Sequence, residues 1–337
     1  MSSLSTRPFL IAAAALLAAS ACTLRHFPQA TASSQLSAMD DHMQGMSAAD
    51  MAAPAITARG ASQGAPGLPP SANTAAARLA DSPRHAEWVK IPWGDGKNDS
   101  LMAWVVYPVT SRAHSPVVVV VHEIFGLTTW VRGVADQVAA DGFIAIAPDL
   151  NSRVRGGPSA DELRADSAVK IIRGVSNADK NAGVTAAARY AMSLPSAEQK
   201  YAVIGFCWGG STTWTYTINE GIAGYSGGVA FYGLPFMKGA IPDADSLAKI
   251  RVPIMLLSGS KDARISAAMP AVDSAMKADG KSYFGRNYEG AIHGFMRAQD
   301  DPRAQNPDPA EEQANLAAAK DAWPRTVAFL KQHLGIE

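Results

Sequence analysis

Residues 200–210 read Lys200-Tyr201-Ala202-Val203-Ile204-Gly205-Phe206-Cys207-Trp208-Gly209-Gly210. The apolar run before Gly205 is typical of a buried strand, and the residues that follow Gly209 are typical of a helix. Cys207 then lies on the turn between them. A Gly-x-Cys-x-Gly turn needs small flanking residues, because the nucleophile adopts a strained backbone where strand and helix pack closely. The stretch predicts a nucleophilic thiol at a strand-to-helix turn; the alternative interpretation is an inert buried thiol.

Further strands and helices surround this stretch in regular alternation. Strand-like runs occur at 87–91, 101–107, 117–121, 143–147, 201–204, 228–232, 253–257 and 282–288. Helix-length segments occur at 128–140, 160–174, 177–192, 209–218, 266–278 and 309–333. The first two strands predict a hairpin, and the alternation that follows predicts a mostly parallel sheet with helices on both faces. The sequence therefore indicates an α/β fold of eight strands, with five consecutive valines at 117–121 as a central, fully buried strand.

The N-terminal region is typical of an exported protein. Arg7 precedes an apolar run at 9–19, which is about half the ~20 residues of a membrane-spanning helix. We interpret 1–21 as a signal peptide that ends beside Cys22. The small residues before Cys22 fit either ordinary cleavage or lipidation of Cys22, as in a bacterial lipoprotein. Both outcomes predict a protein of the bacterial envelope, in the periplasm or anchored to a membrane only through a lipid.

Residues 22–85 are rich in Ala, Ser, Pro, Gly and Met and predict a flexible tether to a folded domain at 86–337. Within the tether, Met39, His42, Met43 and Met46 carry groups that bind copper ions; a Met-containing linker without a metal is the alternative. The 30 basic and 30 acidic residues balance, so bulk charge gives no indication of a nucleic-acid partner.

Three chemically useful side chains follow predicted strands in the order nucleophile, acid, histidine: Cys207, Asp262 and His293. Because ligands bind beyond the carboxyl ends of parallel strands, we expect them to meet there. His293 would take the thiol proton and Asp262 would orient the imidazole. The N–H groups of Trp208 and Ile124 would stabilise the oxyanion. Taken singly, Asp262 could instead be a helix cap and His293 a core histidine.

Five motifs together resemble the dienelactone hydrolase (carboxymethylenebutenolidase) family; they occupy residues 121–126, 147–150, 205–210, 259–262 and 292–297. The resemblance implies an α/β-hydrolase fold. It also implies a cofactor-independent hydrolase, without a metal, that cleaves enol-lactones or related carboxylic esters through a Cys-His-Asp triad and a thioester acyl-enzyme. An exported protein that keeps this scaffold for ligand or copper binding, with little catalysis, remains the alternative.

The resemblance also assigns roles to three charged side chains. It implies that Glu123 interacts with the resting thiol and assists thiolate formation when substrate binds, and that Arg297 pairs with a substrate carboxylate. Arg164 is the nearest candidate for a second carboxylate-binding arginine. A solvated Glu123 and a surface Arg297 are the structural alternatives. We therefore expect a small, anionic ester or lactone as substrate and a monomeric enzyme.

Overall fold

A computed structural model describes residues 65–93, 99–159, 165–219, 221–299 and 308–336. The predicted signal peptide, Cys22, the Met/His-rich stretch and Arg164 lie outside these residues. Within the described part of the chain, no helix combines the length and the apolar character needed to cross a bilayer.

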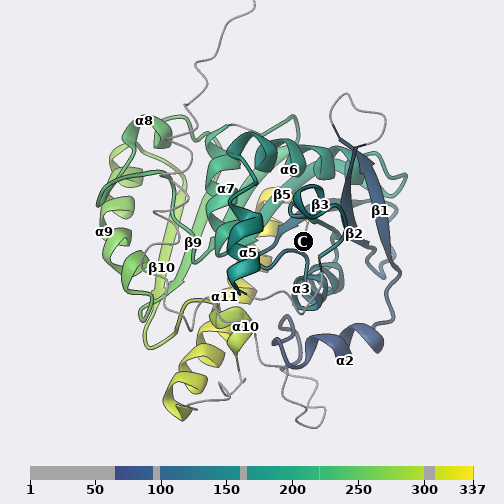
Figure 1. Ribbon diagram of the computed structural model, residues 1–337, viewed down its shortest axis with the longest axis horizontal. Helices are drawn as coiled ribbons and strands as arrows, with labels where there is room; N and C mark the ends of the chain where they lie inside the picture. The colour runs from purple at the N-terminus through teal and green to yellow at the C-terminus, as the bar shows by residue number, and fades with distance from the viewer. Residues whose placement is uncertain (1–64, 94–98, 160–164, 220, 300–307, 337) are drawn as a thin grey trace, which may run out of the picture.

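The fold is an α/β-hydrolase fold built on an eight-stranded sheet (Figure 1). The strands are β1 (Ala86–Pro92), β2 (Ser100–Val106), β3 (Ser115–Val121), β4 (Ile144–Pro148), β5 (Ala197–Phe206), β6 (Tyr225–Phe231), β9 (Ile254–Gly259) and β10 (Tyr283–Tyr288). Their order is β1-β2-β4-β3-β5-β6-β9-β10. The hairpin predicted for the first two strands is confirmed, since β1 and β2 are antiparallel, and from β4 to β10 all neighbours are parallel.

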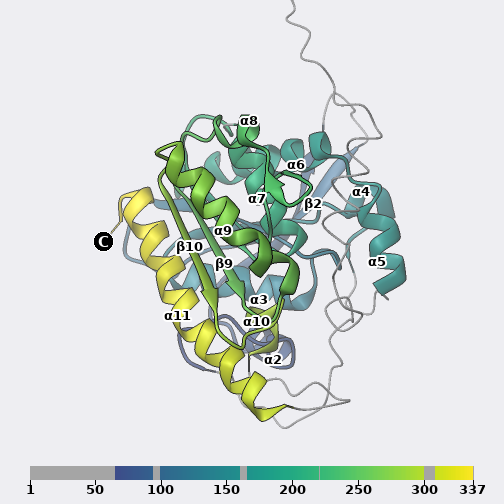
Figure 2. The same ribbon diagram turned by 90° about the vertical axis from the view of Figure 1, so that its left-hand side faces the viewer.

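Apolar side chains explain why this sheet forms the centre of the molecule. Every residue of β3 is buried, as expected for a strand covered on both faces. Helices α6 and α7 pack side by side on one face, while α3 and α11 lie on the other, where Trp323 Nε1 donates to Asp141 at 2.9 Å. Figure 2 shows α11 and α6 on opposite sides of the sheet. The carboxyl ends of the parallel strands therefore remain available at one edge.

The helices agree with the prediction at the long segments and differ at the short ones. They are α2 (Ala75–Ala80), α3 (Thr129–Ala140), α4 (Ser152–Arg155), α5 (Ala165–Ile172), α6 (Asn177–Met192), α7 (Trp208–Ile218), α8 (Ala244–Leu247), α9 (Ala263–Ala278), α10 (Phe295–Ala298) and α11 (Pro309–Leu334). The bounds of α6 are those predicted. The sequence did not indicate α2, α4, α8, α10 or the small hairpin of β7 (Met237–Lys238) and β8 (Ile241–Pro242).

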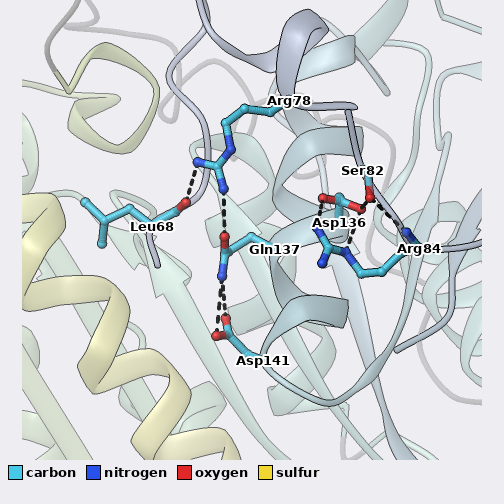
Figure 3. Close-up of polar contacts among 7 residues, drawn as sticks. All are labelled: Leu68, Arg78, Ser82, Arg84, Asp136, Gln137 and Asp141. Carbon is cyan, nitrogen blue, oxygen red and sulfur yellow. Dashed lines mark hydrogen bonds and ion pairs between the residues drawn. The ribbon is translucent and has the colours of Figure 1, made fainter. Parts of the chain in front are cut away.

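Part of the predicted tether is packed against the domain. We call residues 65–84 the strap; it contains α2, and its Leu68, Ser71 and Ala75 are buried. Figure 3 shows Arg78 between the carbonyl of Leu68 and Gln137 of α3. Packing therefore extends upstream of 86 to at least residue 65, because these residues are held by hydrogen bonds that apolar periodicity cannot indicate.

Candidate active site

Cys207 lies on a strained turn between β5 and α7. Its backbone has φ 57° and ψ −115°, a conformation that a non-glycine residue rarely adopts. The flanking glycines make this turn possible, because a Cβ at Gly205 would lie 2.0 Å from the Gly209 carbonyl oxygen and one at Gly209 would lie 2.4 Å from that of Val121. Cys207 forms no disulfide with any described residue and is 2% exposed. The turn has the geometry of a nucleophile elbow.

His293 and Asp262 form a buried pair at the ends of β10 and β9. His293 Nδ1 donates to Asp262 Oδ2 at 2.6 Å, and the other Asp262 oxygen accepts the Ile265 N–H at 3.1 Å. The carboxylate of Asp262 thus orients the imidazole and also caps α9. The helix-cap interpretation and the triad interpretation of Asp262 are therefore compatible. Burial opposes a charge on His293, but the charge of Cys207 and the bonded Asp262 raise its pKa to about 10.

The remaining ring nitrogen of His293 is left to face the thiol. Cys207 contributes to the raised pKa of His293 both by charge and by hydrogen bonding. The contact is loose, since Nε2 has no partner of strict hydrogen-bond geometry among the described residues. Catalytic hydrogen bonds are often long before substrate binds. The structure thus brings together the three side chains that the sequence had separated.

Two polar side chains, His122 and Asn151, fix the loop after β3 by hydrogen bonds. His122 Nε2 accepts the Leu150 N–H at 3.0 Å, and its ring stacks on Trp208 with centroids 5.5 Å apart. Burial lowers the pKa of His122, which favours the neutral ring that this acceptor role requires. Asn151 Nδ2 donates to the Ile124 carbonyl at 3.2 Å. These contacts fix the loop that contains Ile124, whose N–H is predicted to stabilise the oxyanion.

Glu123 and Arg297 meet inside the site. Arg297 Nη1 lies 3.5 Å from Glu123 Oε2, and the two side chains are 12% and 6% exposed. The guanidinium also lies over the Phe125 ring, 5.5 Å from its centroid. Both structural alternatives are therefore wrong for this chain, because neither charge is solvated. Arg297 Nη1 makes no hydrogen bond within the described residues, so it has a donor to spare for another anion.

Tyr232 is a site residue that the sequence did not single out. It follows β6 with φ 38°, and its ring centroid lies 4.9 Å from that of His293. Burial raises its pKa well above the ordinary value, to which the charges of Glu123 and Cys207 add. Its hydroxyl has no hydrogen-bond partner among the described residues. The available signal was its place at a strand end, the criterion that identified Cys207, Asp262 and His293.

The described residues contain no group of three or more His, Cys, Asp or Glu side chains arranged to hold a metal ion. What they offer is a buried thiol, an imidazole oriented by a carboxylate, an ion pair and unpartnered donors at the end of a parallel sheet. Such a set can attack a carbonyl carbon and stabilise the resulting negative charge.

Comparisons with known proteins agree with this fold. Residues 101–334 match the model of the dienelactone hydrolase family. A protein of Escherichia coli (strain K12) named "Putative carboxymethylenebutenolidase" is 26% identical over 274 residues, 80% of this chain and 96% of that protein. The carboxymethylenebutenolidase of Pseudomonas sp. (strain P51) is 29% identical over 228 residues, 66% of this chain and 87% of that one. A crystal structure titled "Putative Dienelactone Hydrolase" from Klebsiella pneumoniae has a TM-score of 0.61 and 26% identity, and covers 74% of this chain and 99% of its own.

Proposed function

Because this chain belongs to the dienelactone hydrolase family, we propose that it cleaves small lactones or carboxylic esters with Cys207 as nucleophile and His293 and Asp262 as its partners. The observation that carries the proposal is the elbow conformation of Cys207 beside the 2.6 Å bond between His293 and Asp262. A strained nucleophile with an oriented imidazole behind it is the arrangement that acyl transfer needs.

The reaction follows from the positions of these groups. The Cys207 sulfur attacks the carbonyl carbon while its proton passes to His293 Nε2. The oxyanion accepts hydrogen bonds from Ile124 N–H and from Trp208 N–H, which has no intrahelical acceptor because Trp208 is the first residue of α7. The carbon–oxygen bond breaks, and His293 returns the proton to the leaving oxygen. Water, activated by His293, then hydrolyses the thioester and releases the acid and Cys207.

The ion pair between Glu123 and Arg297 supports an anionic substrate. Arg297 Nη1 and Glu123 Oε2 are 3.5 Å apart, which is longer than a good hydrogen bond. A substrate carboxylate that forms a shorter bond to Arg297 would therefore displace Glu123. The released carboxylate can then assist deprotonation of Cys207. This sequence of events ties thiolate formation to the arrival of the substrate, which protects a lone thiol from oxidation between turnovers.

The setting of the enzyme is part of the proposal. We propose export to the bacterial envelope, from the signal-like segment at 1–21, and action as a monomer without a cofactor. Mass spectrometry of the mature N-terminus distinguishes lipidation of Cys22 from ordinary signal cleavage. A diacylated Cys22 would establish the lipoprotein, and an N-terminus without a lipid would establish ordinary cleavage.

Activity measurements on dienelactone and on p-nitrophenyl esters test the assignment. Wild type is expected to cleave both, while iodoacetamide treatment and Cys207→Ser each reduce turnover by at least about 10³-fold, since the nucleophile and its proton relay act as one unit. Unchanged turnover in Cys207→Ser would refute the role of the thiol. Absence of turnover in wild type would refute the function.

A further inference from the structure

The strap reaches the active site through α10, the short helix that follows His293 and Gly294. The Ala72 N–H donates to the Arg297 carbonyl at 3.0 Å. Gln299, 1% exposed, donates through Nε2 to the Pro69 carbonyl at 2.9 Å and to that of Met296 at 2.8 Å. The Arg297 carbonyl of α10 is therefore bonded to the strap directly, and the Met296 carbonyl is bonded to it through Gln299.

The strap is itself held on α3. Trp130 Nε1 donates to the Pro70 carbonyl at 2.9 Å, and Arg78 joins the Leu68 carbonyl, at 2.6 Å, to Gln137. At the far end, Arg84 pairs with the buried Asp136 (Figure 3). In Figures 1 and 2, α2 lies beside α3. The strap thus connects a helix packed on the sheet to the helix that carries Arg297.

These bonds have a feature that simple packing would not require. They converge on backbone carbonyls and on one buried glutamine whose own backbone has φ 24°. Such a residue keeps an unfavourable backbone conformation only where its surroundings fix it.

We propose that the strap is a positioning element of the active site, which holds α10 so that Arg297 meets a substrate carboxylate. This inference rests on the proposed function. It predicts that loosening the strap weakens recognition of the carboxylate rather than the attack by Cys207.

Gly133 of α3 offers a way to loosen the strap without touching the site. A Cβ at this position would lie 2.5 Å from Cγ of Pro70, and the proline ring has little freedom to move away. Alanine is a better helix former than glycine, and α3 packs against the strands, so the strap is the element that must shift. Gly157→Ala is the matched control, because a Cβ there meets no atom within 4 Å.

The test compares kcat/KM for dienelactone, which carries a carboxylate, with kcat/KM for its methyl ester. In Gly133→Ala the ratio is expected to fall about tenfold, since displacing an oriented group by about 1 Å can cost up to 10²-fold; in Gly157→Ala it stays at the wild-type value. Gln299→Met, which removes the donor to Pro69, is expected to lower the ratio as Gly133→Ala does. An equal loss for both substrates, or an unchanged ratio, would overturn the proposal.

Hydrogen exchange provides a reading that does not depend on turnover. Amides of residues 295–299 are expected to exchange faster in Gly133→Ala than in wild type and Gly157→Ala. If wild type cleaves neither substrate, the proposed function fails and this measurement alone decides the role of the strap. Unchanged exchange in Gly133→Ala would then overturn it.

Discussion

Asp262→Asn changes one charge at the centre of the proposed relay. In wild type, one carboxylate oxygen accepts from His293 at 2.6 Å and the other from the Ile265 N–H at 3.1 Å. An asparagine that keeps the bond to Ile265 through its oxygen presents its NH₂ group to His293 Nδ1. That nitrogen must then accept, so the proton moves to Nε2, where it prevents the ring from accepting the thiol proton.

The expected loss of kcat/KM has two causes, the lost hydrogen bond to Asp262 and the changed tautomer of His293. A hydrogen bond to a charged group contributes about 1.5–3 kcal/mol, and 1.4 kcal/mol corresponds to tenfold, so this loss alone lowers kcat/KM about 10- to 10²-fold. The wrong tautomer lowers the rate further, because the same substitution in a serine triad lowers kcat about 10⁴-fold. We expect a decrease between about 10² and 10⁴-fold.

The assay is the rate of p-nitrophenyl acetate hydrolysis by purified Asp262→Asn, with circular dichroism to verify folding. Asparagine caps a helix as well as aspartate does, so α9 keeps its N-terminus. Asp308→Asn is the matched control, because Asp308 also caps a helix, accepting the Ala310 N–H at 3.0 Å, but it pairs with Lys261 and not with His293. A decrease of less than tenfold in a folded Asp262→Asn protein would refute the relay.

Three further predictions concern the charged and aromatic residues of the site. Arg297→Lys keeps the charge but loses the planar fork, so KM for dienelactone is expected to rise about tenfold with little change for the methyl ester; an equal rise for both would contradict the role of Arg297. Tyr232→Phe removes a buried hydroxyl that has no partner among the described residues, so Tm is expected to stay level or rise. The value of kcat/KM is expected to fall about tenfold, which corresponds to one hydrogen bond from this hydroxyl to the substrate. A fall in Tm with full activity would contradict this. Because the pKa of His293 is raised from 6.5 to about 10 in the fold, its stabilisation is complete below pH 6.5 and is lost as the pH rises to about 10. Unfolding measurements should therefore show a larger loss of stability between pH 6.5 and 10 in wild type than in His293→Gln, and parallel profiles would contradict the shift.

The sequence predicted the sheet because its signal is local. The valine run of β3 and the alternation of strands with helices predict the eight strands and the long helices, and α6 has the predicted bounds. Cys207, Asp262 and His293 were found because each follows a strand, and a parallel sheet brings its carboxyl ends together. Their convergence therefore needed no knowledge of side-chain rotamers.

The rest depends on tertiary contacts that no local pattern encodes. The strap lacks apolar periodicity, and its attachment uses carbonyls of Leu68, Pro69 and Pro70, which any residue type could supply. The pairing of Glu123 with Arg297 depends on the side-chain rotamers of a residue in the loop after β3 and a residue in α10. Tyr232 was the last residue of a predicted strand, and its contact with His293 and its positive φ are tertiary features that the strand pattern does not contain.

The most direct test of the account is to look for the acyl-enzyme. Wild-type protein is mixed with p-nitrophenyl acetate, quenched with acid within the first turnover, digested and analysed by mass spectrometry. The account predicts one acetyl group on the peptide that contains Cys207, removable by hydroxylamine, and none on Cys207→Ala. Release of p-nitrophenol without an acetyl group on that peptide, or with the group on another residue, would contradict covalent catalysis by Cys207.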